Sequence, residues 1–403
     1  MRIIGLDVGR DTAVLCCLEK FPDNILQHYQ KLRREKKFYK VNCDRAGVEK
    51  LLSFKPNGIV LEPTGYWYSQ FWVKVAKVSG IDIYWVGHSD LYCARGEYGF
   101  KNKRDSEDAL SLAATYFDSS FVNIHGAKRY LNYQKNSEVT DLRELFLAKE
   151  QLQKLRTSLI TQLRQRLSYE LPEIATAKMQ ISTVRGFTPI IYWLATDTPN
   201  VRYDKKHKLS IARDLDIRVS QYTRNHARLI YNIEKRYFKH LELLQNALTN
   251  SNFAGYNRVF DRFNFGVSCR SVLLFNIYPF DKFLIDGKPL IERDIGNNGK
   301  LQKRDRSLRK FQAFLGMSYS YAESGNRSTK KFHGSAMVRS HLYAWAVCTI
   351  APTNKPTKSE VNQQLSDRYQ QLRVNVKGKD ALVRILFKAT RMLYSELVKE
   401  LVR

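Results

Sequence analysis

Four carboxylates stand in the first 110 residues at positions where they could meet at one point. Asp7 lies inside the chain's first apolar stretch, where a lone buried carboxylate is costly unless it faces a metal or a cleft. Glu62 ends another apolar stretch. Asp105 and Asp108 are three residues apart and share one helix face, while Glu107 points elsewhere. Clustered carboxylates need cations, and hard oxygen ligands select Mg²⁺ or Mn²⁺. We therefore predict a divalent-metal site, at which two ions could activate a nucleophile and stabilise a leaving oxygen at phosphorus.

The elements around these carboxylates must bring them together. The apolar and turn patterns predict strands over 2–8, 12–19, 38–41, 58–63 and 81–86, and helices over 47–54, 66–78 and 104–116. This order, β-β-β-α-β-α-β-α, is the ribonuclease-H-like (RuvC-like) arrangement, a mixed sheet covered by helices. In that topology the fourth strand lies beside the first, so Glu62 would come next to Asp7.

Beyond residue 130 the pattern changes to long helices. Apolar residues spaced by three or four form one stripe over 145–167 and another over 230–248, which predicts an antiparallel coiled coil. We expect three domains, 1–130, 131–252 with a segment near 172–217 inserted at the coil tip, and a mainly helical 253–403. Within the last, helices are predicted over 311–317, 334–349, 359–374 and 380–402, and a loop over the polar, basic 286–310. Gly266 begins a predicted helix. The N-terminus of this helix could bind a phosphate, or the glycine could be an ordinary helix cap.

The charge of the chain indicates a polyanionic partner. Lys plus Arg number 67 against 39 acidic residues, a net charge of +28, and basic runs occur throughout the sequence. This favours a long nucleic acid, with a membrane surface as the weaker alternative. The longest apolar stretch, 342–352, is shorter than the ~20 residues of a membrane span. Six cysteines and eight histidines show no metal-ligand spacing, so we expect a reduced, cytoplasmic protein without structural zinc.

Three acidic motifs resemble those of a known family. Residues 7–9 (Asp-Val-Gly), 61–65 (Leu-Glu-Pro-Thr-Gly) and 103–109 (Lys-Arg-Asp-Ser-Glu-Asp-Ala) are similar to the motifs of the insertion sequence 110 family of transposases, the DEDD recombinases guided by a bridge RNA. Arg104 stands where the family usually has Thr, which moves no carboxylate. The resemblance extends over nearly the whole chain, through the coiled coil to a C-terminal transposase domain.

The family's second active element is a serine in that C-terminal domain, and Ser324, before Gly325, matches it. A serine hydroxyl on a glycine-containing loop, close to Lys330 and Lys331, suits attack on a phosphodiester. The sequence departs from the family here, because the usual proline is absent and 332–335 (Phe-His-Gly-Ser) replaces a different element. Three other serines therefore remain alternatives: Ser318, Ser320 and Ser328.

The resemblance implies a mechanism and partners. The serine would form a phosphoserine link to DNA, assisted by Mg²⁺ at the four carboxylates, and a freed 3′ hydroxyl would reverse the step and exchange strands. A structured guide RNA would pair with donor and target double-stranded DNA, in a homodimer or homotetramer bridged by the coiled coil and associated with a prokaryotic nucleoid. Candidate nucleic-acid contacts, for which a solvated surface is the alternative, are Lys103, Arg104, Arg143, Arg156, Arg164, Arg270, Arg327, Lys330 and Lys331.

Other function classes share part of this pattern. A metal-dependent nuclease or junction resolvase would use the same carboxylates with water as nucleophile and would not need Ser324. An actin-like ATPase or sugar kinase also opens with Asp-Val-Gly, but it should carry a second Asp-x-Gly phosphate loop and would not need a charge of +28. A non-catalytic RNA-binding scaffold would not need four placed carboxylates.

Overall fold

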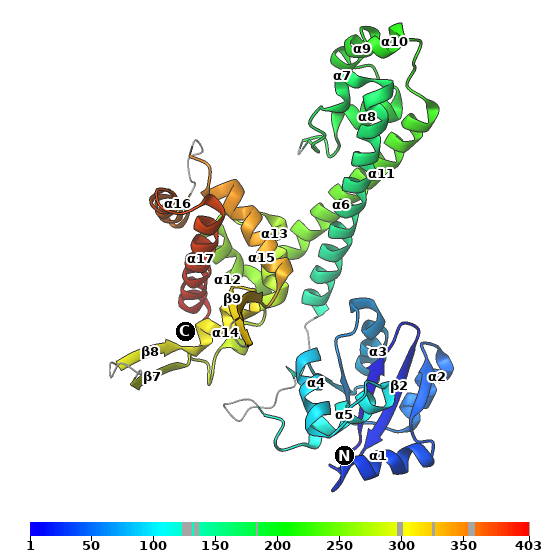
Figure 1. The fold of residues 1–403 in the computed structure, drawn as a ribbon, viewed down its shortest axis with the longest axis vertical. Coiled ribbons are helices and arrows are strands. Elements are labelled where there is room, and N and C mark those ends of the chain that lie inside the picture. Colours follow the sequence, from blue (N-terminus) through cyan, green and yellow to red (C-terminus); the bar gives the residue numbers. More distant parts are fainter. Residues whose placement is uncertain are drawn as a thin grey trace. The chain divides into compact units, whose positions relative to one another are not determined.

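The chain forms two compact units, Met1–Lys135 and Asn136–Arg403 (Figure 1). The computed structural model describes residues 1–122, 131–132, 137–182, 184–295, 301–324, 327–353 and 359–402. Within these ranges the side chains of 66, 131, 132, 137, 294, 321–324, 327 and 328 are not described. Each unit is considered by itself.

The first unit is built on a six-stranded sheet of order β3-β2-β1-β4-β5-β6. β1 is central and antiparallel to β2, which is antiparallel to β3, while β4 runs parallel to β1 and β5 parallel to β4. The five predicted strands are confirmed, and a two-residue sixth strand, which was not predicted, pairs antiparallel with β5. The strands are β1 (Ile3–Val8), β2 (Thr12–Leu18), β3 (Tyr39–Asn42), β4 (Gly58–Leu61), β5 (Asp82–Trp85) and β6 (Leu131–Asn132).

Helices give this sheet two separate cores. One core contains residues of α1, α4 and α5, and the other contains residues of α2 and α3. The unit is therefore mixed α/β, as predicted, with helices α1 (Ile25–Arg34), α2 (Arg45–Ser53), α3 (Tyr66–Val78), α4 (His88–Glu97) and α5 (Asp105–Phe117).

Two of these helices, α1 and α4, were not predicted. α1 begins at Asn24, whose side chain accepts a hydrogen bond from the backbone of Gln27, and it buries Tyr29 and Leu32. Its basic end obscured this amphipathic pattern in the sequence. α4 follows Gly87 and belongs to the same core as α1.

The second unit contains two long helices that lie side by side, α6 (Ser137–Glu170) and α11 (Gln221–Leu248) (Figure 1). The predicted apolar stripe is wrong by one residue in part of α6, because Leu155 is 55% exposed whereas Arg156 is buried. The buried positions of α6 include charged residues, which the apolar pattern alone does not reveal.

The segment between these helices is itself helical. It forms α7 (Pro172–Ala175), α8 (Pro189–Thr196), α9 (Val201–Lys208) and α10 (Ile211–Asp214) at one end of the α6–α11 pair (Figure 1). Its apolar core includes Leu163 and Leu167 of α6, Ile190 and Leu194 of α8, and Ile230 of α11. The predicted excursion at the helix tip is thus a small helical cap packed on both long helices.

At the other end, α6 and α11 join the core of the remaining chain. That core includes Leu142 and Phe146 of α6 and Leu244 of α11, so it crosses the predicted domain boundary at residue 252. Its α-helices are α12 (Ala254–Arg262), α13 (Val267–Ile277), α14 (Arg306–Phe314), α15 (Ala336–Trp345), α16 (Glu360–Arg373) and α17 (Gly378–Leu401). It also contains the 3₁₀-helices η1 (Ser251–Phe253) and η2 (Phe280–Phe283) and the short π-helix η3 (Ala346–Ile350).

Residues 286–310 contain a β-hairpin rather than the predicted loop. β7 (Ile291–Ile295) pairs antiparallel with β8 (Leu301–Asp305). Glu292 lies opposite Arg304, and its carboxylate lies 2.6 Å from the guanidinium of Arg306. The prediction was wrong because both strands are mostly charged or polar and lack the apolar alternation that predicts a strand.

A second hairpin replaces the loop expected around Ser324. β9 (Ser318–Ser324) pairs antiparallel with β10 (Arg327–His333), so the backbone of Ser324 closes β9 opposite Arg327. The rings of Tyr319 and Phe332 lie 4.6 Å apart across the two strands, and both lie against Phe387 of α17. These cross-strand aromatic contacts explain why the segment is extended.

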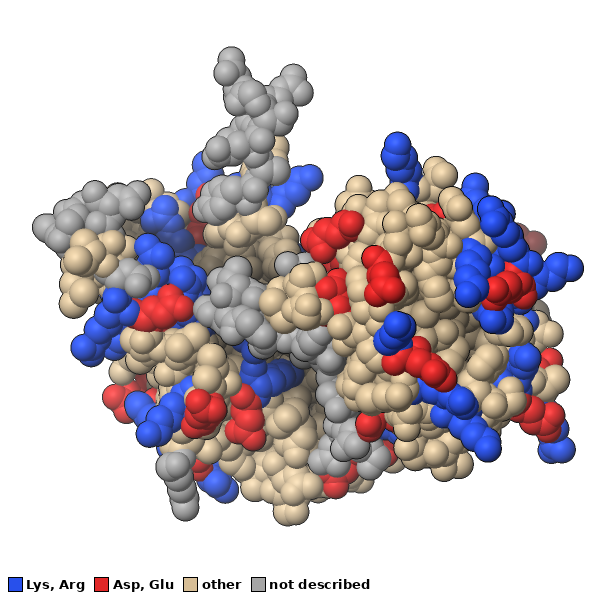
Figure 2. Space-filling view, turned by 90° about the horizontal axis from the view of Figure 1, so that it is seen from below, with Lys and Arg blue, Asp and Glu red and all other residues tan. Residues whose placement is uncertain are grey.

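The surface carries charges of both signs. On the face that Figure 2 shows, Lys and Arg side chains stand on both units with acidic side chains between them. Within the described parts of the chain, no helix is long and apolar enough to cross a membrane.

Candidate functional site

The register of the sheet brings the first two predicted carboxylates together. β1 and β4 are parallel, and Leu6 lies opposite Leu61. The next residues, Asp7 and Glu62, therefore follow at neighbouring positions where the two strands end. Both side chains are partly exposed, as expected at the edge of an otherwise buried sheet.

The other two carboxylates come from α5, which lies directly over β1. A Cβ atom at Gly5 would lie 1.9 Å from the carbonyl oxygen of Ala109 and 2.5 Å from the nitrogen of Ala113, so only glycine allows this approach. Asp105 and Asp108 lie in the first turn of α5, where Asp105 is exposed and Asp108 is buried. The missing side chain of Gly5 thus allows the acidic end of α5 to come close to Asp7.

The electrostatics of Asp7 indicate that the other three predicted carboxylates lie close enough to act on it. Burial, followed by the charges of Asp108, Asp105 and Glu62, raises the pKa of Asp7 to about 7, and Lys103 opposes this shift. These three are the carboxylates predicted to surround it. Glu107, which also lies in the first turn of α5, is buried and stands 3.9 Å from Arg104.

Two side chains of α4 contact this acidic cluster, and neither was predicted. Arg95 Nη1 donates to Asp108 Oδ1 at 2.7 Å, and both side chains are largely buried. His88 Nδ1 shares a hydrogen bond with Glu62 Oε1. The missing signal was α4 itself, because without that helix nothing in the sequence places His88 or Arg95 near the carboxylates.

The chemistry of the cluster suits a hard divalent cation. The four predicted residues offer carboxylate oxygens only. The pKa of Asp7 is raised by burial first and then by its three acidic neighbours, whose negative charge a cation would offset. With Glu62 and Asp108 turned to His88 and Arg95, no three acidic, histidine or cysteine side chains of the described residues are arranged to hold a metal ion.

The serine candidates lie on the β9–β10 hairpin. The side chains of Ser324 and Ser328 are outside the described part of the structure. The hydroxyls of Ser318 and Ser320 each lie 3.4 Å from a backbone carbonyl of β10. Lys330 and Lys331 are exposed on β10, where they lie opposite Tyr321 and Ser320 of the strand that ends at Ser324.

The predicted nucleic-acid contacts differ in their surroundings. Lys103, Arg104 and Arg164 are exposed, while the side chain of Arg327 lies outside the described residues. Arg143 is partly buried, with its guanidinium 5.9 Å from the centre of the Phe275 ring.

Two other arginines that were predicted to contact nucleic acid form ion pairs within the protein. Arg270 is half-buried and pairs with Asp261 at 2.6 Å. The prediction that Arg156 contacts nucleic acid is wrong. Its buried guanidinium lies 2.8 Å from the fully buried Glu234 and also donates to Thr188. Arg156 joins α6 to α11 and is not available to a phosphate.

Comparison with protein-family models gives no match for this chain, and comparison with curated proteins finds no similar sequence.

Proposed function

We propose that the protein is a DNA recombinase of the insertion sequence 110 type, which exchanges strands through a phosphoserine intermediate. The observation that carries the proposal is that the β1–β4 register and the first turn of α5 bring Glu62, Asp105 and Asp108 to Asp7, whose pKa is raised by burial and by these three charges. The strand order 3-2-1-4-5, with carboxylates at the ends of adjacent parallel strands, supports a RuvC-like domain. The net charge of +28 supports DNA and RNA as partners.

In this proposal the four carboxylates hold Mg²⁺ or Mn²⁺, which when bound stabilises negative charge on a phosphate and its leaving oxygen. The protein's own contribution is to bring the carboxylates together through the β1–β4 register and the close approach of α5 to Gly5. Arg95 contacts Asp108, and His88 contacts Glu62.

Ser324 is the proposed nucleophile. Its hydroxyl loses a proton as the Oγ–P bond forms, the P–O3′ bond of the DNA breaks, and the released O3′ takes up a proton. Attack by the 3′ hydroxyl of the partner DNA then reverses these changes, so no phosphodiester bond is lost. Lys330 and Lys331 supply positive charge close to the reacting phosphate.

We propose that a structured guide RNA selects the donor and target DNA by base pairing, while the protein contacts backbone and shape. The α6–α11 pair serves in this proposal as the coiled coil that bridges a dimer or tetramer. Their antiparallel packing and their length, 34 and 28 residues, support that role.

A covalent-adduct assay tests the mechanism. Protein, Mg²⁺, guide RNA and end-labelled donor and target DNA are combined, denatured in SDS and examined for DNA attached to protein. Wild type should give an adduct that Ser324→Ala and Asp7→Ala both abolish. Ser320→Ala is the matched control, because it removes a hydroxyl from the same strand and should retain the adduct.

The alternative enzyme class gives the opposite pattern. A metal-dependent nuclease that uses water would yield free cleaved ends, would give no adduct, and would be unaffected by Ser324→Ala. An adduct that persists in Ser324→Ala but is lost in Ser320→Ala would identify Ser320, not Ser324, as the nucleophile. Failure of wild type to bind any nucleic acid would exclude both classes.

A further inference from the structure

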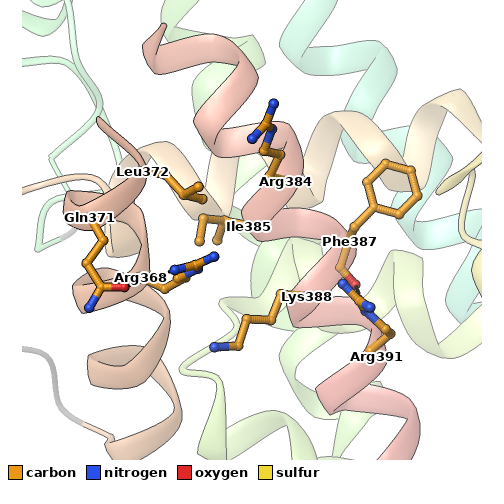
Figure 3. A pocket seen from close by; sticks show the side chains of 8 residues that line it. All are labelled: Arg368, Gln371, Leu372, Arg384, Ile385, Phe387, Lys388 and Arg391. Atoms are coloured by element: carbon orange, nitrogen blue, oxygen red, sulfur yellow. Dashed lines mark hydrogen bonds between the residues drawn. The ribbon is translucent and has the colours of Figure 1, made fainter. Parts of the chain in front are cut away.

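A cleft of about 720 Å³ between α16 and α17 carries four cations and no acidic residue in its lining (Figure 3). None of these cations was predicted to bind anything. The lining residues are Arg368, Gln371, Leu372, Arg384, Ile385, Phe387, Lys388 and Arg391. Figure 3 shows Arg368 reaching from α16 towards α17 and Lys388 reaching from α17 towards α16.

None of these four cations forms an ion pair with another described residue. Among the described residues, the polar contacts of these cations are between Arg368 and the Gln371 amide oxygen, 3.1 Å, and between Arg391 and the Phe387 carbonyl, 3.2 Å. Neither partner carries a charge. Mutual repulsion between the cations therefore remains, and a bound anion would relieve it.

The opposite situation holds near the C-terminal end of the same helix. There Glu396 and Glu400 of α17 pair with Arg258, Arg262 and Lys399. The contrast shows that unbalanced charge is a property of the cleft and not of α17 as a whole.

The spacing of the cations suits a repeating anion better than a single small one. Arg384, Lys388 and Arg391 follow one another by four and three residues and share one face of α17. They span about 10 Å along the helix, a length over which a nucleic-acid strand presents about three phosphates. The floor of the cleft is apolar, formed by Leu372 and Ile385, and can support the aliphatic stems of the cations.

We propose that this cleft binds the phosphodiester backbone of the nucleic-acid partner, an inference that rests on the proposed function. Phe387 lines the cleft, and its ring also lies 5.3 Å from Tyr319 and 6.5 Å from Phe332. The cleft therefore adjoins the helix that supports the hairpin carrying Ser324. A strand bound there would lie along α17, the helix against which the Tyr319–Phe332 end of this hairpin packs.

The test compares salt-dependent binding of labelled single-stranded RNA and duplex DNA, by fluorescence anisotropy, between 50 and 200 mM KCl. Arg384→Gln/Lys388→Gln should weaken binding about tenfold or more, and should reduce the slope of log K against log[salt] by about 1.8 for duplex DNA or about 1.4 for a single strand. The nucleic acid whose slope falls identifies the backbone that the cleft contacts. The charge-conserving variant Arg384→Lys/Lys388→Arg should keep the slope of wild type.

Arg258→Gln/Lys399→Gln is the matched control, because it also removes two positive charges from this unit but takes them from ion pairs. Its slope should stay within a few tenths of wild type. An unchanged slope in the cleft variant, with wild type still binding, would overturn the cleft assignment alone. Full competition by 10 mM inorganic phosphate would also overturn it, in favour of a small-anion site. Absence of binding by wild type would overturn the proposed function as well.

Discussion

The guanidinium of Arg95 lies 2.7 Å from the carboxylate of Asp108, and the two side chains are 12% and 4% exposed. α4 therefore supplies a buried positive charge to the cluster in which a divalent cation is expected. A buried ion pair of this kind costs much to break from one side, because the remaining charge stays in a medium that solvates it poorly.

Replacing Arg95 should destabilise the metal-free first unit and make it depend on Mg²⁺. Arg95→Gln leaves Asp108 without its partner, so we expect a loss of about 3 kcal/mol in the free energy of unfolding in EDTA. Millimolar Mg²⁺ should recover much of that loss, which urea unfolding with and without Mg²⁺ would measure. Arg104→Gln is the control, since Arg104 is exposed and lies 3.9 Å from Glu107. If Arg95→Gln lowered the free energy of unfolding equally with and without Mg²⁺, Mg²⁺ would not be replacing the positive charge of Arg95.

Removing the charge of Asp7 should stabilise the metal-free protein at alkaline pH. The pKa of Asp7 is raised to about 7 by burial and by the neighbouring carboxylates, so its ionised form opposes folding above that pH. At pH 8 in EDTA, Asp7→Asn should gain about 2 kcal/mol, allowing for the partial exposure of the group. The gain should shrink towards pH 5, because wild type then takes up the proton.

Thermal unfolding across this pH range, with added Mg²⁺ as a second variable, checks the prediction. Mg²⁺ should raise the unfolding temperature of wild type more than that of Asp7→Asn. Asp11→Asn, at a position 84% exposed, should show neither effect. A pH-independent difference between Asp7→Asn and wild type would argue against the carboxylate cluster.

The close contact at Gly5 should not tolerate even a methyl group. Gly5→Ala would place its Cβ against the backbone of α5, and we expect a destabilisation of about 3 kcal/mol together with displacement of Asp105 and Asp108 from Asp7. Gly96→Ala in α4 is the matched control, because nothing lies within 4 Å of its added Cβ, and a gain of about 0.5–1 kcal/mol is expected. Urea unfolding measures both. A mild Gly5→Ala variant with unchanged Mg²⁺ response would show that the approach of α5 is not required.

The strand order and the four carboxylates were accessible to sequence reasoning for a physical reason. A strand buried on both faces reads as an apolar run, and a carboxylate at its end stands out. The role of Gly5 was not accessible, because a glycine within a strand shows no sign of the helix that packs over it. His88 and Arg95 were missed along with α4.

The long helices show a different limit of sequence patterns. The predicted stripe followed leucines, yet the buried face of α6 uses Lys149 and Arg156 in place of apolar side chains. Arg156 is compensated by Glu234 on α11, two positions that are 78 residues apart in the sequence. A buried charge pair of this kind is indistinguishable in sequence from two solvated charges. For this reason Arg156 was predicted to contact a phosphate, whereas in the structure it links α6 to α11.

The pair formed by Glu150 and His341 should give the second unit a pH optimum of stability. Their hydrogen bond raises the pKa of His341, and it lowers that of Glu150 to about 2 with further help from Lys149. The stabilisation from His341 is complete below its ordinary pKa of 6.5 and is lost as pH rises through the raised value. That from Glu150 is complete above 4.5 and is lost as pH falls through about 2. Together they are fully effective between about 4.5 and 6.5.

His341→Asn should therefore cost about 1 kcal/mol at pH 5.5 and almost nothing at pH 8.5, a difference that urea unfolding at the two pH values would measure. The modest size follows from the partial exposure of both side chains, 18% for His341 and 25% for Glu150. His240→Asn is the control, since His240 Nδ1 contacts the backbone carbonyl of Arg236 and its replacement should leave the pH dependence unchanged. An equal cost of His341→Asn at both pH values would mean that His341 stabilises α15 by packing on Phe146, whose ring lies 5.2 Å away, and not by its charge.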